Sequence, residues 1–172
     1  MEKILVVDDE RAIVQSVRML LKDSYEIVSA SSADEAVDLF RRERPDLILL
    51  DIIMPGVSGL EVLKIIKEQD PTIPVIVLTA TKMVKPAVEA MKMGATDYIT
   101  KPFDIEELRL IIKKSLNTSS LEKEVKYLRS ELDNRYKFQN IIGKSRAMRE
   151  IYSKVEQIAD TKHTVLITGE SG

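Results

Sequence analysis

Short β-branched apolar runs alternate with helical patterns over residues 1–116, and this alternation restricts the possible folds more than any other feature. The runs cover residues 4–7, 25–29, 47–50, 75–78 and 97–99. Most are apolar on both faces, which is typical of parallel strands covered by helices on each side. Ser32, Ser58 and Asp104 each precede a Glu by three residues and mark helix starts between the runs. The sequence therefore predicts an α/β domain with a doubly wound, five-stranded parallel sheet.

Composition excludes several function classes. Lys plus Arg number 26 and Asp plus Glu 28, a net charge of −2, so we expect this chain not to bind DNA by itself. The sequence has no Cys, which excludes disulfides and thiolate metal sites. Apolar runs stay well below the roughly 18 residues of a membrane span, and the N-terminus has no signal pattern. We expect a cytoplasmic protein without membrane association.

Three acidic residues close the first apolar run, although such a run is suited to burial. Asp8 and Asp9 repel each other, at a cost of about 4 kcal/mol for charges about 4 Å apart at an effective dielectric near 20. Asp51 ends the third run, and ligands of doubly wound sheets bind beyond the carboxyl ends of the strands. Because only oxygen ligands are available, Mg²⁺ is the ion that fits best. The alternative is that Asp8 or Asp9 only caps the following helix.

Two further polar side chains follow strand ends. Thr79 closes the fourth run, and Lys101 lies just after the fifth. A carboxylate can attack phosphorus when a metal and a cation absorb charge on the phosphoryl oxygens. Asp51 is therefore the candidate nucleophile, with Lys101 as the cation and Thr79 as a hydroxyl donor. Taken singly, Asp51 is equally typical of a turn residue, Lys101 of a surface lysine and Thr79 of a strand-end cap.

The segments V-V-D-D-E, L-L-D-I-I-M-P-G-V-S-G, V-L-T-A and D-Y-I-T-K-P-F together resemble the receiver domain of bacterial two-component response regulators. The resemblance covers residues 1–116 and implies a flavodoxin-like fold. It implies transfer of a phosphoryl group from a histidine kinase to Asp51. By the same resemblance, Mg²⁺ is held by Asp9, Asp51 and the backbone carbonyl of Ile53, with Asp8 acting mainly through water.

The resemblance also implies a switch pair, Thr79 and Tyr98. Thr79 moves towards the phosphoryl group, and Tyr98 turns inward to fill the space left. The bond between Lys101 and Pro102 is expected to be cis by the same analogy.

A polar stretch at residues 117–120 predicts a break, followed by a linker helix within residues 117–138. The helix carries a narrow apolar seam typical of a coiled coil, which consists of Leu121, Val125, Leu128 and Leu132. Burying eight such side chains contributes at most about 12–24 kcal/mol, against about 4–15 kcal/mol for association. We therefore expect a marginal homodimer seam that needs help from the receiver. The alternative is that the seam packs on its own chain.

Residues 139–172 resemble the opening of the AAA+ ATPase domain of NtrC-type activators, which act on sigma-54 RNA polymerase. The resemblance rests on I-I-G-K-S, then a helical pattern, then a predicted strand in T-V-L-I-T-G-E-S-G. It implies nucleotide-binding residues at Ile141, Ile142, Gly143, Gly169, Glu170, Ser171 and Gly172. The pattern G-x-x-x-x-G-K-[ST] stops after four positions, so we expect a partial AAA+ segment, cut within the Walker A loop, that does not hydrolyse ATP. Taken alone, G-E-S-G is typical of any strand-to-turn corner.

These patterns together predict a fragment of a two-component response regulator. ATP, sigma-54 RNA polymerase and enhancer DNA are expected partners of the full-length protein only. One alternative is a Mg²⁺-dependent phosphohydrolase with an aspartate nucleophile, but such enzymes carry D-x-D, and Ile53 stands two residues after Asp51. A second alternative is an interaction module that has lost phosphorylation. It is disfavoured because the five converging site residues are all present, namely Asp8, Asp9, Asp51, Thr79 and Lys101.

Overall fold

The computed structural model describes the chain except residues 57, 81–83, 137–144, 160–163, 167 and 170–172, and for side chains also except 80, 84, 130–136 and 149. The chain divides into two compact units, Met1–Lys126 and Tyr127–Gly172.

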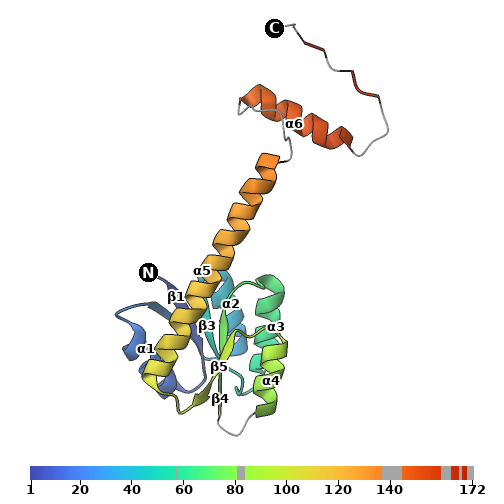
Figure 1. Cartoon of the computed structure of the whole chain (residues 1–172). Helices are drawn as coiled ribbons and strands as arrows, with labels where there is room; N and C mark the ends of the chain where they lie inside the picture. Colours follow the sequence, from blue (N-terminus) through green and yellow to red (C-terminus); the bar gives the residue numbers. More distant parts are fainter. Residues whose placement is uncertain (57, 81–83, 137–144, 160–163, 167, 170–172) are drawn as a thin grey trace. The chain divides into compact units, whose positions relative to one another are not determined.

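The first unit is built on a five-stranded parallel sheet in the order β2-β1-β3-β4-β5 (Figure 1). Its elements are β1 (Lys3–Val7), α1 (Arg11–Leu21), β2 (Glu26–Ala30), α2 (Ala33–Glu43), β3 (Leu47–Asp51), α3 (Gly59–Gln69), β4 (Val75–Ala80), α4 (Val84–Lys92), β5 (Asp97–Lys101) and the part of α5 (Ile105–Tyr136) up to Lys126. This order is that of a flavodoxin-like doubly wound fold, so the predicted fold class is confirmed. Each observed strand lies within two residues of its predicted position.

Helices cover both faces of the sheet, and each face has its own apolar core. Leu5, Val7 and Leu50 point to the face packed by α2, α3 and α4. Ile4 and Val6 point to the face packed by α1 and α5. Because neighbouring residues of one strand point to opposite cores, the central strands are apolar throughout, as the sequence indicated.

The capping residues predicted at three helix starts are confirmed. Ser32 and Ser58 are the N-caps of α2 and α3, and their hydroxyl groups accept backbone N–H groups of the first turn. Asp104 Oδ1 accepts the N–H groups of Glu106 and Glu107 at 2.8 and 3.2 Å. These caps fix where the helices begin beyond the strands.

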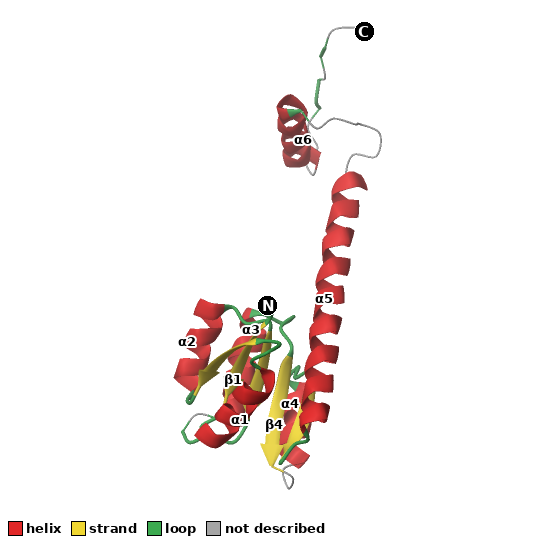
Figure 2. Cartoon of the chain, turned by 90° about the vertical axis from the view of Figure 1, so that its left-hand side faces the viewer, coloured by secondary structure: helices red, strands yellow, loops and turns green. Residues whose placement is uncertain are grey.

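The break predicted at residues 117–120 is wrong. Helix α5 continues through these residues as one helix (Figure 2). Thr118 Oγ1 donates to the carbonyl of Lys114 at 3.0 Å, which satisfies its hydroxyl within the helix. Ser115 and Ser119 are buried, so the polar stretch includes part of the helix face that packs on the receiver.

The second unit contains α6 (Arg146–Ala159), which confirms the helix predicted after residue 145. Its apolar side includes Met148 and Tyr152, which are partly buried. The described residues between 164 and 169 form no strand, although one was predicted there. A strand requires a hydrogen-bonded neighbour, and the described part of this unit offers none. None of the described helices combines the length and apolar character that crossing a bilayer would require.

Candidate functional site

The predicted carboxylates gather at the carboxyl edge of the sheet. Asp51 is the last residue of β3, and Asp8 directly follows the neighbouring strand β1. Asp8, Asp9 and Asp51 each offer one carboxylate oxygen, and these oxygens lie within 4.8 Å of one another. Asp8 and Asp51 are buried, with 1% and 4% of their surface exposed, and Asp9 is more exposed. The sequence prediction that these acids converge is therefore correct.

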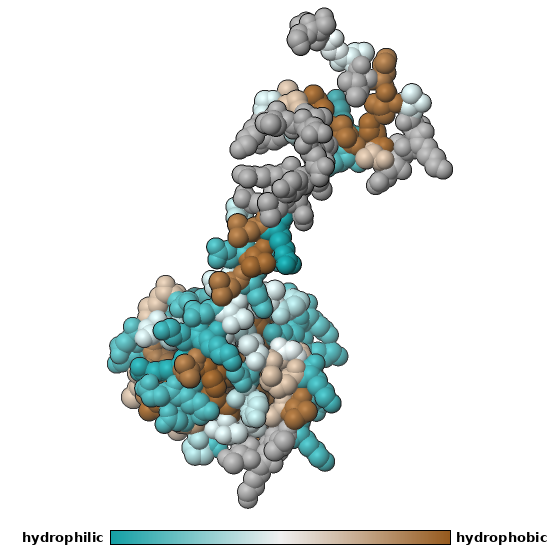
Figure 3. All heavy atoms as spheres, in the orientation of Figure 1, coloured by the Kyte–Doolittle hydropathy of each residue, from teal (hydrophilic) through white to brown (hydrophobic). Residues whose placement is uncertain are grey.

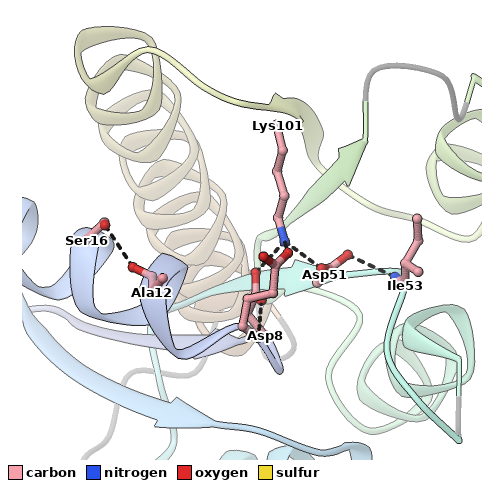
Figure 4. Close-up of polar contacts among 7 residues, drawn as sticks. Asp8, Ala12, Ser16, Asp51, Ile53 and Lys101 are labelled. Atoms are coloured by element: carbon pink, nitrogen blue, oxygen red, sulfur yellow. Dashed lines mark hydrogen bonds and ion pairs between the residues drawn. The ribbon is translucent and has the colours of Figure 1, made fainter.

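Lys101 joins two of these acids. It is the last residue of β5, and its Nζ lies 2.7 Å from Asp8 Oδ2 and 2.6 Å from Asp51 Oδ2 (Figure 4). The lysine side chain is only 13% exposed, so these are short, shielded ion pairs. The Lys101–Pro102 bond is cis, as predicted.

Local turns hold the second carboxylate oxygen of Asp8 and of Asp51. Asp8 Oδ1 accepts the N–H of Glu10 at 2.9 Å, and Asp51 Oδ1 accepts the N–H of Ile53 at 2.9 Å. The N-cap of α1 is Glu10 rather than either aspartate, so helix capping does not explain the acidic run. Both carboxylates are held by one backbone donor and one lysine.

Burial and charge act in opposite directions on the ionisable groups of the site. Burial raises the pKa of Asp8, and hydrogen bonds from Lys101 and from the Glu10 N–H offset this only in part. Burial also disfavours the charged form of Lys101, but its hydrogen bonds to Asp51 and Asp8 outweigh burial and raise its pKa. Lys101 therefore remains a cation across the physiological range.

The donor set fits a hard divalent cation. Three aspartates with one lysine leave two negative charges uncompensated, and every side-chain ligand offered is oxygen. Mg²⁺ accepts such ligands and retains several waters. Asp8, Asp9 and Asp51 are the side chains that would hold it.

The predicted switch pair is split between the interior and the surface. Thr79, in β4, is 1% exposed, whereas Tyr98, in β5, is 47% exposed. Thr79 and Thr100 are paired across β4 and β5, so Tyr98 is offset along the strand from Thr79. Ile53 is also exposed at the rim of the site.

Two residues of the site were not assigned from the sequence. Glu10 Oε1 lies 3.4 Å from Lys101 Nζ, which adds a carboxylate to the cluster. Gly59 packs against β3, the strand that ends at Asp51, and a Cβ there would overlap the carbonyl oxygen of Asp51. The signals were present, since Glu10 is the third acid of V-V-D-D-E and Gly59 ends P-G-V-S-G.

The apolar seam of α5 does not pack on its own chain in the described residues. Leu121, Val125 and Leu128 are 61%, 46% and 50% exposed. Figure 3 shows apolar side chains gathered on this part of the helix. Leu132 lies in α5, but its side chain is outside the described residues.

Most of the predicted nucleotide-binding residues also lie outside the described residues, namely Ile141, Ile142, Gly143, Glu170, Ser171 and Gly172. Gly169 is described and is exposed. The nucleotide site therefore stays a prediction.

A family model described as the response regulator receiver domain matches residues 4–113. The chain belongs to this family. It carries the phosphorylation-controlled receiver of a two-component regulator, which confirms the family inferred from the motifs. The strands that carry Asp51, Thr79 and Lys101 all fall within the matched residues.

Known proteins with similar sequence and structure extend the comparison beyond the receiver. The chain is 38% identical to regulatory protein AtoC of Escherichia coli over 99% of its length, but covers 37% of AtoC. A solved response regulator receiver domain from Clostridium thermocellum is 36% identical, with a TM-score of 0.68, and matches 70% of this chain and 98% of that one. NtrX from Brucella abortus, solved in complex with ATP, is 36% identical, with a TM-score of 0.70, over 92% of this chain and 35% of that one. The chain thus spans about a third of the longer relatives.

Proposed function

We propose that Asp51 accepts a phosphoryl group from a phosphohistidine of a histidine kinase, and that this controls the pairing of two linker helices. The observation that carries the proposal is the position of Lys101 Nζ between two buried carboxylates, one of them Asp51. A buried acid with a cation 2.6 Å away is arranged to receive a group that brings negative charge.

The transfer is a simple displacement at phosphorus. A carboxylate oxygen of Asp51 forms the new P–O bond while the P–N bond to the imidazole breaks, and its electron pair returns to the ring nitrogen. Lys101 is already hydrogen-bonded to Asp51, so it meets the charge of the phosphoryl oxygens without reorganisation. Asp9, Asp51 and the backbone carbonyl of Ile53, with Asp8 acting through water, would hold Mg²⁺, which would supply positive charge against the remaining phosphoryl oxygens.

Thr79 and Tyr98 are the proposed switch. Thr79 is buried near the end of β4 and is the hydroxyl that would meet the phosphoryl group. Tyr98 is 47% exposed, so it starts from the surface position from which it would turn inward when Thr79 moves. This pairing rests on the family resemblance and on the burial of the two side chains.

We place the chain within a longer NtrC-type activator. Its similarity to AtoC and NtrX over nearly its whole length supports that arrangement. ATP would bind only the longer protein, an inference supported by the NtrX complex with ATP. Sigma-54 RNA polymerase and enhancer DNA would be partners of the same longer protein, acting in the cytoplasm. The exposed Leu121, Val125 and Leu128 support a homodimer through α5.

A phosphohydrolase is disfavoured by the residue two positions after the nucleophile. Such enzymes place a second aspartate there as general acid, and this chain has the apolar, exposed Ile53. The main chain of Ile53 instead donates to Asp51. The acceptor role therefore fits the site better than turnover.

The deciding experiment is phosphorylation by a small-molecule phosphodonor in the presence of Mg²⁺. Intact-mass measurement should find one added phosphoryl group on the natural chain and none on Asp51→Asn. Asp38→Asn, which changes an exposed acid of α2, is the matched control and should be labelled normally. Equal labelling of Asp51→Asn and the natural chain would end the assignment.

Sedimentation of the same samples tests the seam separately. We expect a dimer that Leu128→Lys disrupts and that Tyr127→Lys, an exposed position off the seam, preserves. A monomeric natural chain, with and without a phosphoryl mimic such as beryllium fluoride, would remove the dimer from the proposal and leave the acceptor role intact.

A further inference from the structure

Helix α5 has a docked face and an exposed face beyond the predicted end of the receiver. Ser119 is 7% exposed, and its Oγ lies 3.5 Å from the carbonyl oxygen of Thr72, in the loop between α3 and β4. Leu121, a seam residue, follows Ser119 by two residues, about 200° around the helix axis, so the two lie on nearly opposite sides of the helix. The same helix can therefore contact its own receiver and leave the seam open.

Lys67, near the end of α3, organises the loop that α5 contacts. Its Nζ donates to the carbonyl oxygen of Ile73 at 2.6 Å and lies 3.4 Å from that of Pro71. Its stem carbons Cγ, Cδ and Cε lie 3.7–3.9 Å from where a Cβ on Gly94 would be. One lysine thus joins α3, the loop before β4 and the turn before β5.

Charges on α5 complement charges at this loop. Burial lowers the pKa of Lys67, and the negative charges of Asp70 and Glu122 oppose that shift. Burial acts against ionised Asp70, but hydrogen bonds from Thr72 and the charge of Lys123 hold its pKa below the usual range. Glu122 and Lys123 are neighbours on α5, and each has a favourable electrostatic interaction with a group of opposite charge, Lys67 and Asp70 respectively.

We propose that the loop between α3 and β4 is a docking site for residues 119–123 of α5, with Lys67 as its positioning residue. We call the set Lys67, Asp70, Thr72, Ser119, Glu122 and Lys123 the α5 latch. The latch holds one face of α5 on the receiver and keeps the seam on the opposite face. Its role in pairing rests on the proposed dimer, whereas the docking itself does not.

Helix α3 links the latch to the acceptor strand. The helix begins at Gly59, against the backbone of Asp51, and carries Lys67 near its other end. A single rigid element therefore contacts both the acceptor strand and the docking loop. This makes the latch the contact through which the receiver positions the linker.

Hydrogen exchange of the whole chain, followed by mass spectrometry, tests the latch. Lys67→Met and Ser119→Ala should each speed exchange of the amides of residues 117–126 by about tenfold, because local opening of α5 becomes easier. Exchange in β1 to β5 should stay unchanged. Lys64→Met on α3 and Ser120→Ala on α5 alter exposed neighbours and should behave as the natural chain.

Two results would overturn the latch. One is natural exchange at 117–126 in both Lys67→Met and Ser119→Ala. The other is faster exchange throughout the sheet in Ser119→Ala, which would make the contact a general packing interaction. If Lys67→Met fails to fold, Ser119→Ala decides alone.

The same samples separate the latch from the proposed function. Phosphoryl acceptance at Asp51 should be retained in every variant. If the natural chain accepts no phosphoryl group while the exchange differences appear, the proposed function fails and the latch stands.

Discussion

Lys101 relieves part of the repulsion that the acidic run creates. The repulsion at Asp8 and Asp9 pointed to a positive partner, and the sequence assigned that role to a metal. The structure shows that a lysine from β5 already pairs with Asp8 and Asp51. Because one ammonium balances only one of three aspartates, the site still favours a dication. The two kinds of cation are complementary rather than alternative.

Replacing Asp8 by Asn should stabilise the metal-free protein at neutral pH. Burial raises the pKa of Asp8, so the folded state binds this proton more tightly than the unfolded state. The free energy of unfolding therefore falls as pH rises from the unfolded pKa through the raised folded pKa. Thermal melts in a chelator should show Asp8→Asn above the natural chain by a few degrees, where about 2–4 °C corresponds to 1 kcal/mol.

The pH dependence of the melting temperature and its response to Mg²⁺ test the same cause, which is the negative charge of buried Asp8. The difference in melting temperature should shrink as pH falls through the raised pKa of Asp8, because the natural side chain then becomes neutral. Millimolar Mg²⁺ should stabilise the natural chain more than Asp8→Asn. Asp38→Asn, at an exposed position, should match the natural chain throughout. A less stable metal-free Asp8→Asn at neutral pH would contradict the argument.

The sequence could predict which residues meet at the site because chain position alone places them there. Asp8, Asp51, Thr79 and Lys101 are at or next to the carboxyl ends of strands that the parallel sheet brings together. The contact between Glu10 and Lys101 depends on the path of two long side chains. No periodicity in the sequence encodes such a path.

At the scale of elements, the close approach of α3 to β3 fixes the backbone that carries Asp51, the proposed phosphoryl acceptor. The N–H of Gly59 donates to the carbonyl of Ile52 at 3.3 Å. A Cβ on Gly59 would lie 2.6 Å from Ile52 Cα, inside any ordinary contact distance. The neighbouring atoms are backbone and cannot rotate aside, so only glycine fits.

Gly59→Ala should therefore destabilise the protein by about 1–3 kcal/mol, the usual cost of overpacking, and slow phosphoryl acceptance at Asp51. Chemical denaturation and intact-mass time courses measure the two effects. Gly169→Ala is the matched control, because nothing lies within 4 Å of its Cβ position. Gly59→Ala with natural stability would mean that α3 can withdraw from β3 at little cost.

Helix α5 shows where sequence pattern misleads at this scale. Ser and Thr side chains favour turns in isolation because they compete for backbone hydrogen bonds. In α5 the Thr118 hydroxyl is satisfied inside the helix, and Ser119 contacts the Thr72 carbonyl. Tertiary packing therefore overrides the local preference at 117–120. The seam was predictable because its spacing is a property of the helix alone.

At the scale of the whole molecule, the compact unit that contains the receiver extends further along the chain than the receiver motifs do. The family match ends at residue 113, and the polar stretch placed the boundary at 116. The compact unit instead runs to Lys126, since residues after 116 contact the loop before β4. The motifs identify the residues of the site. The boundary of the compact unit depends instead on contacts between residues distant in sequence, such as Ser119 and Thr72, which are 47 positions apart.

Truncation tests this boundary. A chain of residues 1–126 keeps Ser119, Glu122 and Lys123, and should unfold with the same free energy as the receiver of the whole chain. A chain of residues 1–116 loses all three and ends at Leu116, which is 7% exposed in the intact receiver. The attraction between exposed opposite charges contributes about 0–1 kcal/mol for each of the two pairs, and a hydrogen bond about 1 kcal/mol. The shorter chain should therefore be less stable by about 1–3 kcal/mol, as measured by chemical denaturation. A chain ending at 136 is the control for length and should match residues 1–126. Equal stability of the chains ending at 116 and 126 would place the boundary at 116, because the contacts made after Leu116 would then contribute nothing to the folded receiver.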